Sequence, residues 1–387
     1  MTSPNIQMLK QTYKEDENYL ILGFDEPEER SMSLIFRQDS LQWHIRVLFR
    51  GKNGITTRKN FLARRKAFEA LISMIDFSSL PLLPDTVTKI VIRQWRPWLF
   101  FSCFRRLPVK SVDFSTTSEI GSISSSGLAC QIRQDDSRVH YPCCGPYSDL
   151  LMARLSEIQF EEDIYGNVYR VVWNGEQYIY KTVDHPFYYP RCTKIFEEEV
   201  RYLRYCRGFP NVARLIGMVN SQNPFKTNIH EEGPYVITGM LLKYYPNGTL
   251  EDAIDSKDRR GLSQSWAKQL ASALLTLHGV GITHLDIKPA NVVFDATNEA
   301  VFIDIGTGYT YELLAPEIRH VVTPHKLPFE KRRQSDLWAF GLLMMEMTKL
   351  NEDSHIRETL QKLGKQLAHD DPKQRPTLSE IIHSLDV

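Results

Sequence analysis

The sequence lacks the features that define several protein classes. Its six cysteines contain no Cys-x-x-Cys pair, and Cys143 and Cys144 are adjacent, which is an unfavourable geometry for a mutual disulfide. This usage argues against a cysteine-based metal site and favours reduced thiols. No apolar run has the length of a membrane span, because the most apolar candidate, residues 96–104, is too short. No N-terminal stretch combines a basic start, an apolar core and a small-residue cleavage site, as a secretory signal does. We therefore expect a cytoplasmic or nuclear protein without a membrane span.

The chain also has no excess charge of either sign. Its 47 basic and 47 acidic residues give a formal net charge of zero, so bulk charge attracts neither nucleic acids nor membranes. Lysines and arginines gather between Arg46 and Lys66, but no nucleic-acid-binding motif accompanies them. A solvated helix face explains this cluster better than a phosphate-binding face. We therefore expect no nucleic-acid partner.

The most informative stretch that is present runs from Thr283 to Asn291, with the letters THLDIKPAN, and is followed by Asp-Ile-Gly at 304–306. Phosphoryl transfer needs a carboxylate to accept the hydroxyl proton, which Asp286 can supply, and a cation on the transferring group, which Lys288 can supply. It also needs oxygen ligands for a metal on the phosphates, and Asn291 and Asp304 provide them. The stretch therefore predicts a catalytic loop followed by a metal-holding turn.

This spacing, His-x-Asp-x-Lys-x-x-x-Asn and then Asp-x-Gly, resembles the eukaryotic protein kinase superfamily over residues 155–387. Further motifs follow in the family's order: Lys181, Glu199, Ala-Pro-Glu at 315–317, Asp336 to Gly341, and Arg375. The resemblance implies an α+β, two-lobed fold with a small lobe at 155–242, a hinge at 243–246 and a large lobe at 247–387. Lys288 and Thr310 resemble the serine/threonine branch of the family. Asp336 would anchor the catalytic loop, and Glu317 would pair with Arg375.

The resemblance implies that ATP binds between the lobes with Mg²⁺, or alternatively Mn²⁺. Lys181 would hold the α- and β-phosphates and would itself be held by Glu199, with Glu198 as the competing partner. The hinge backbone at 243–245 would bind the adenine edge. The residues implied in nucleotide contacts are Gly166, Val168, Lys181, Leu242, Lys243, Tyr244, Tyr245 and Val293.

Some family features are missing from the nucleotide site. Of the pattern Gly-x-Gly-x-x-Gly-x-Val, only Gly166 and Val168 remain. Glu161 and Asp163 take the other two glycine positions, where carboxylates would repel phosphates unless they point outward. Ile179 replaces the small alanine that usually lies over adenine, so we expect it to crowd the base.

Features of regulation and substrate docking are missing as well. Leu285 replaces the arginine that usually receives an activation-loop phosphate, and only residues 307–309 separate Gly306 from Thr310. The interval from Asp336 to Arg375 leaves little room for the helix that docks protein substrates in this family. We therefore expect activity that does not depend on phosphorylation of 304–317.

Residues 1–150 are predicted to form a smaller mixed α/β domain. The polar residues 1–16 suggest a frayed end. Strands are expected at 19–24, 32–36, 43–49 and 86–92, with an amphipathic helix at 60–77. A turn-rich break at 141–146 places the domain boundary near residue 150. No chemistry is evident in this part, so we expect it to dock a partner or to regulate the small lobe.

The leading hypothesis is an ATP- and Mg-dependent phosphotransferase that acts on a hydroxyl, foremost a serine or threonine of a protein. Two alternatives stay open. A kinase for a small molecule is favoured by the reduced peptide platform. A pseudokinase or scaffold is favoured by Glu161, Asp163 and Ile179.

Overall fold

The computed structural model describes residues 5–16, 27–51, 61–94, 121–123, 128–186, 188–256, 262–306 and 308–386. The predicted strand at 19–24 and the apolar run at 96–104 lie outside them. Contacts divide the chain into unit 1, Met1–Arg138 with Gln222–Val236, and unit 2, Val139–Ser221 with Ile237–Val387. The domain boundary near residue 150 stays a prediction. Within the described residues, no helix has the length and apolar character to cross a membrane.

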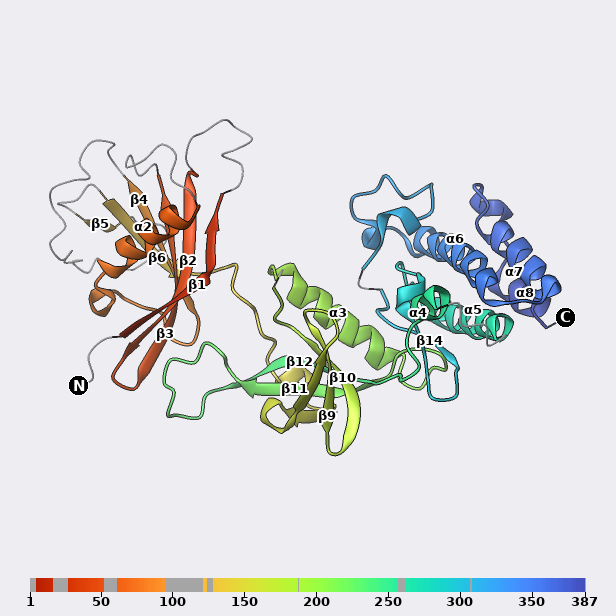
Figure 1. The fold of residues 1–387 in the computed structure, drawn as a ribbon, viewed down its shortest axis with the longest axis horizontal. Coiled ribbons are helices and arrows are strands. Elements are labelled where there is room, and N and C mark those ends of the chain that lie inside the picture. The colour runs from red at the N-terminus through yellow and green to blue at the C-terminus, as the bar shows by residue number, and fades with distance from the viewer. Residues whose placement is uncertain are drawn as a thin grey trace. The chain divides into compact units, whose positions relative to one another are not determined.

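Unit 1 is built on a six-stranded sheet in the order β1-β2-β3-β4-β6-β5. Its strands are β1 (Asn5–Glu15), β2 (Glu29–Gln38), β3 (Leu41–Arg50), β4 (Val87–Gln94), β5 (Gly121–Ile123) and β6 (Leu128–Gln134). Helix α2 (Phe61–Ser73) lies on one face of the sheet (Figure 1). Its buried Phe68, Leu71 and Ile72 share a core with strand residues such as Ile45 and Val47, which alternate with polar neighbours.

The prediction that residues 1–16 are frayed is wrong. Asn5–Glu15 forms β1, which pairs antiparallel with β2. Ile6 and Met8 alternate with polar residues and pack against the core of unit 1. Ile6, Met8, Leu9 and Tyr13 are interspersed with polar residues. The local signal is weak because the strand is stabilised mainly by its partner. The predicted helix at 60–77 also ends earlier, at Ser73.

Unit 1 contains one segment that is distant in sequence, Gln222–Val236. The Thr227 amide donates to the Asp85 carboxylate at 2.9 Å, and the Asp85 amide donates to the Thr227 hydroxyl at 2.7 Å. The Gln42 amide donates to the Thr227 carbonyl at 2.8 Å. The side-chain amide of Asn223 donates to the Asp85 carbonyl at 2.9 Å. Gln222–Val236 is thus bonded by backbone and side chains to the turn before β4 and to β3.

Unit 2 begins with a second six-stranded sheet, in the order β7-β11-β12-β10-β9-β8. Its strands are β7 (Leu151–Arg154), β8 (Gln159–Asp163), β9 (Val168–Trp173), β10 (Glu176–Thr182), β11 (Leu215–Gln222) and β12 (Tyr235–Lys243). β7 pairs in parallel with β11, where a Cβ atom on Gly217 would lie 2.4 Å from the Leu151 carbonyl oxygen. Glycine at 217 therefore permits this pairing. Helix α3 (Arg191–Tyr205) packs on the sheet through Phe196, Val200 and Leu203.

The rest of unit 2 is mainly helical (Figure 1). It contains α4 (Leu250–Asp255), α5 (Ser263–Gly279), α6 (Phe329–Met347), α7 (Ser354–Leu367), α8 (Leu378–Ser384) and the strand pair β13 (Val292–Phe294) and β14 (Ala300–Phe302). Thr249 caps α4, because its hydroxyl accepts from the Asp252 amide. A Cβ atom on Gly341 would lie 2.6 Å from the Gly364 carbonyl, so two glycines allow α6 and α7 to approach closely.

The α+β fold with a sheet-rich lobe and a helical lobe is confirmed. Between α6 and α7 the chain forms only the 3₁₀ turn Thr348–Leu350 and a short link. The interval from Asp336 to Arg375 therefore holds the rest of α6 and the single α-helix α7.

Candidate active site

The loop 283–291 is held by a carboxylate that is fully buried in α6. Asp336 accepts hydrogen bonds from the backbone amides of His284 and Leu285, both at 2.8 Å, and contacts the His278 ring at 2.9 Å. Leu285 lies in the left-handed region with φ 65°. Such a conformation is uncommon for a branched side chain and persists only where surrounding contacts impose it. The predicted anchoring by Asp336 is confirmed, and it explains how the strained loop is maintained.

Both carboxylate oxygens of Asp286 are engaged. The Thr310 hydroxyl donates to one oxygen at 2.7 Å. The Lys288 ammonium lies 2.8 Å from the other oxygen and donates to the Thr310 hydroxyl at 3.2 Å. The Asn291 amide donates to the Asp286 side chain at 3.0 Å and to its carbonyl at 2.8 Å. Thr310 thus contacts both Asp286 and Lys288, and the Asp286 carboxylate is held in one orientation.

A second charged group centres on Lys181 of β10. Its ammonium lies 2.8 Å from Glu199 and 2.7 Å from Asp304. Glu199 is buried on α3 whereas Glu198 is exposed, so Glu199 is the partner, as preferred from the sequence. Burial alone would lower the pKa of Lys181, but the carboxylates of Asp304 and Glu199 raise it above its usual value. In turn, the Lys181 ammonium lowers the pKa of Asp304. Burial raises the pKa of Glu199, and the Lys181 ammonium opposes that rise. Lys181 and Asp304 are therefore charged near neutral pH.

Backbone hydrogen bonds join the two groups. The Gly306 amide donates to the His284 carbonyl at 3.0 Å, and the Ile303 amide donates to the Asn291 carbonyl at 3.1 Å. His284 is fully buried, and its Nδ1 accepts from the Asp286 amide at 3.3 Å. Burial lowers the pKa of His284, so the ring is neutral. The turn 303–306 and the loop 283–291 are thereby fixed to each other.

Asn291 and Asp304 have the chemistry of a hard-metal site. The Asn291 amide nitrogen is used by Asp286, so its carbonyl oxygen is the atom left for a cation. One oxygen of Asp304 contacts Lys181, and the other can bind a metal. Over the described part of the chain, no group of three or more His, Cys, Asp or Glu side chains could hold a metal ion. An ion would thus need the phosphates of a nucleotide as further ligands, which is how Mg²⁺ usually binds.

Four of the residues implied in nucleotide contacts lie on the adjoining strands β9, β10 and β12: Val168, Lys181, Leu242 and Lys243. Val168 pairs with Lys181, and Ile179 pairs with Leu242 on β12. Val293 bridges Thr249 at the start of α4. At the end of β12, the Lys243 amide donates to the Arg214 carbonyl at 3.0 Å, so this amide is already used. Gly166 and Val168 lie in the β8–β9 region, and their contacts with adenine or phosphate stay predictions.

Sequence reasoning missed Arg170 of β9. Its guanidinium contacts Glu161 and Glu162, both at 3.1 Å, and donates to the Tyr244 hydroxyl of the hinge at 3.4 Å. Gln177 also donates to Glu161, at 2.8 Å. The carboxylate in the first glycine position is therefore paired, which reduces the expected repulsion of phosphates. The available signal was that Arg170 follows Val168 by two residues and so shares its face of the strand.

The large lobe is braced by the predicted ion pair. Arg375 donates two hydrogen bonds to Glu317, at 2.6 and 2.9 Å, and its guanidinium also lies over the Trp338 ring. The Arg375 side chain is fully buried. This pair fixes the segment that follows Thr310 against the helices.

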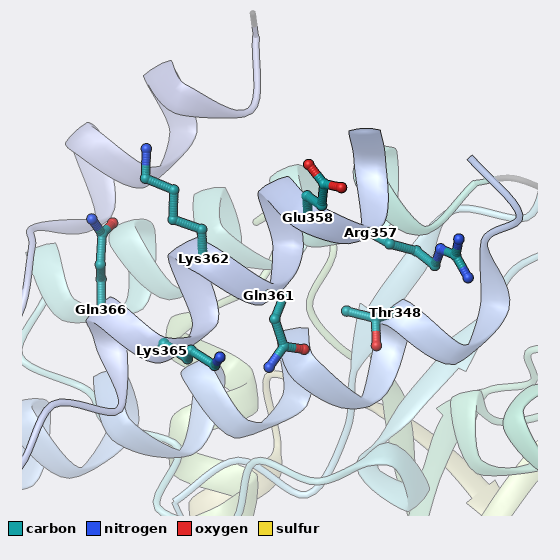
Figure 2. A pocket seen from close by; sticks show the side chains of 7 residues that line it. All are labelled: Thr348, Arg357, Glu358, Gln361, Lys362, Lys365 and Gln366. Carbon is teal, nitrogen blue, oxygen red and sulfur yellow. The ribbon is translucent and has the colours of Figure 1, made fainter. Parts of the chain in front are cut away.

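A groove of about 720 Å³ lies elsewhere, along α7 (Figure 2). It is lined by Thr348, Arg357, Glu358, Gln361, Lys362, Lys365 and Gln366. None of the candidate site residues contributes to it. Figure 2 shows polar side chains spread over two sides of the helix rather than converging on one point, so the groove is separate from the site described above.

Comparisons with known proteins agree with this geometry. The protein kinase domain family matches residues 164–352. A probable cAMP-dependent protein kinase catalytic subunit of Encephalitozoon cuniculi is 29% identical over 39% of this chain and 45% of its own length. MAP kinase-interacting serine/threonine-protein kinase 1 of Xenopus laevis is 27% identical over 52% of this chain and 51% of its own. Mitogen-activated protein kinase kinase 9 of Arabidopsis thaliana is 30% identical over 28% and 38%.

These alignments span at most about half the length of the three curated relatives. The motifs, their geometry and the family match cover the same part of the chain. Residues 164–352 therefore form a protein kinase domain of the eukaryotic protein kinase superfamily.

Proposed function

We propose that the protein is a kinase that transfers the γ-phosphoryl group of ATP to a serine or threonine hydroxyl of a protein. Protein kinase domains in general use ATP and a divalent metal ion. The proposal is carried by one observation, the Asp286–Lys288–Thr310 cluster joined by backbone hydrogen bonds to the Lys181–Glu199–Asp304 group. The first group suits an acceptor hydroxyl, and the second suits phosphates and a metal.

Each side chain has a defined part in this reaction. Asp286 orients the acceptor hydroxyl and takes its proton as the acceptor oxygen bonds to the γ-phosphorus and the bond to the β-phosphate oxygen breaks. Lys288 balances negative charge on the moving group, and Lys181, held by Glu199, binds the remaining phosphates. Asn291 and Asp304 would hold Mg²⁺ or Mn²⁺, which neutralises charge on the phosphates. The Thr310 hydroxyl holds the side chains of Asp286 and Lys288 in a fixed position relative to each other.

The test is phosphate transfer from radiolabelled ATP with Mg²⁺ to a panel of serine, threonine and tyrosine peptides. Asp286→Asn should lower kcat by about 10²–10⁴-fold, as expected for loss of a positioned base. ATP affinity should change little, because Asp286 does not contact Lys181, Glu199 or Asp304. Asp304→Asn should abolish turnover and weaken metal-dependent nucleotide binding. Wild-type turnover in Asp286→Asn, with peptide labelling intact, would contradict the proposed role of the loop.

A second candidate is a kinase that acts on a small-molecule hydroxyl. The observation that favours it is the short link between α6 and α7, which offers little surface for a protein substrate. Profiling small alcohols beside the peptides separates the two functions. Labelling of small molecules without any labelling of peptides would favour the second.

A further inference from the structure

Residues 139–150, at the start of unit 2, run along helix α3, and we call them the α3 strap. Tyr147 of the strap is 7% exposed and shares a core with Phe196, Val200 and Leu203 of the helix. Val139, Tyr141, Cys144 and Leu150 pack against the same core. The strap therefore covers the apolar face of α3 rather than passing over it as a solvated connection.

Hydrogen bonds fix the strap near the beginning of α3. The His140 amide donates to the Tyr188 hydroxyl at 2.9 Å, which lies 2.8 Å from the Thr193 hydroxyl. The Thr193 hydroxyl donates to the His140 carbonyl at 2.7 Å. These three bonds form a closed ring between the strap, the chain before α3 and the first turn of the helix. Each hydroxyl in the ring both donates and accepts, so its polar groups are satisfied on burial.

The strap is also fixed near the end of α3 and to the sheet. Arg204, in the last turn, contacts the Asp149 carboxylate at 2.6 Å and donates to the Pro146 carbonyl at 3.3 Å. The Ile237 amide of β12 donates to the Pro142 carbonyl at 2.8 Å. The strap thus ties both ends of the helix to the sheet that carries Lys181.

Glu199 lies on α3 between Thr193 and Arg204, the two residues that the strap contacts, and its carboxylate is 2.8 Å from the Lys181 ammonium. We propose that the α3 strap holds α3 where Glu199 meets Lys181, so that Tyr147 is a positioning residue for phosphoryl transfer. The inference rests on the proposed function for its catalytic consequence. Because residue 285 is a leucine and the segment after Gly306 is short, a phosphate on that segment would find no arginine at 285 to bind. The α3 strap would then order the site in place of such a phosphate.

The test uses the full chain with Tyr147→Ala. Tyr205→Ala is the control, because Tyr205 is the last residue of α3 and is 61% exposed. Tyr147→Ala should lower kcat about tenfold or more, since a helix freed from its contacts populates positions in which Glu199 is displaced. Hydrogen exchange should rise in α3 and β10 but not in α5 or α6. Tyr147→Phe should have the kcat and the hydrogen exchange of the wild type, because the aromatic packing is retained. Tyr147→Leu tests whether a smaller loss of side-chain volume has a smaller effect than Tyr147→Ala.

A double-mutant cycle with Glu199→Gln distinguishes positioning from general stability. If the strap acts through Glu199, Tyr147→Ala should lower kcat far less in the Glu199→Gln background than in the wild type. Equal losses in both backgrounds, uniform loss of protection across unit 2, or unchanged exchange in α3 would each overturn the proposal. The exchange measurement needs no turnover. An inactive wild type in which Tyr147→Ala still loosens α3 and β10 alone would therefore refute the kinase function while supporting the strap.

Discussion

Replacing Thr310 with valine removes one hydroxyl from the candidate active site while retaining the branched shape of the side chain. The hydroxyl donates to Asp286 at 2.7 Å and accepts from Lys288 at 3.2 Å. Hydrogen bonds to charged groups are worth about 1.5–3 kcal/mol. Thr310 is only half-buried and the direct contact of Lys288 with Asp286 remains, so the lower part of this range, about 1.5–2 kcal/mol, applies. If the loss falls on the transition state, kcat should decrease about 10- to 30-fold.

Steady-state kinetics with a peptide acceptor would measure this effect. Thr310→Val should lower kcat, and Thr310→Ser should retain most of it, because serine keeps the hydroxyl. The KM for ATP should stay within about twofold in both variants, since Thr310 contacts neither Lys181 nor Asp304 in the hydrogen-bond network. If Thr310→Val turns over like the wild type, or if the KM for ATP rises as much as kcat falls, Thr310 does not orient Asp286 and the reasoning fails.

Further predictions concern stability and regulation. Arg375→Met should lower the free energy of unfolding by about 3–5 kcal/mol in urea titrations, because Glu317 is left without its buried partner; a combined Glu317→Leu/Arg375→Met variant should lose less than the sum of the single losses. Burial lowers the pKa of His284 below 6.5, so protonation favours the unfolded chain. The free energy of unfolding should therefore fall as pH drops below about 6.5. A His284→Phe variant whose free energy of unfolding falls equally steeply with pH would contradict this. Phosphatase treatment should leave activity unchanged when mass spectrometry shows an unmodified 304–317 peptide, since Leu285 cannot receive a phosphate; activity that returns only with phosphate on that peptide refutes it.

The proximity of the polar side chains in the loop 283–291 could be predicted from sequence because they lie close together along the chain. Asp286, Lys288 and Asn291 fall within one short stretch, so their spacing alone brings them near each other. The choice of Glu199 over Glu198 needed only the helical phase, since Glu199 shares a face with buried Leu203. Residue spacing along the chain is sufficient to predict which side chains lie together where a single turn or helix carries them.

Other features depend on pairing between distant segments and left little local trace. β1 is defined by its ladder with β2, and its own apolar content is low. The inclusion of Gln222–Val236 in unit 1 rests on hydrogen bonds of Asp85 and Thr227, two residues that are also common in solvated turns. The role of Arg170 emerged only from the register of β8, β9 and the hinge. Residue spacing does not predict such contacts, because neither of the two contacting segments has a distinctive sequence pattern of its own.

Leu285 shows why the loss of a phosphate-receiving arginine is compatible with an ordered catalytic loop. Its backbone is strained at φ 65°, at a typical cost of about 1–3 kcal/mol. Asp336 offsets this cost through two hydrogen bonds to backbone amides, and the Leu285 side chain is itself 5% exposed. Neither contribution depends on the charge of residue 285. The position of Asp286 is therefore set by a buried carboxylate and by packing of the loop, whereas an arginine at 285 would have coupled that position to a phosphate.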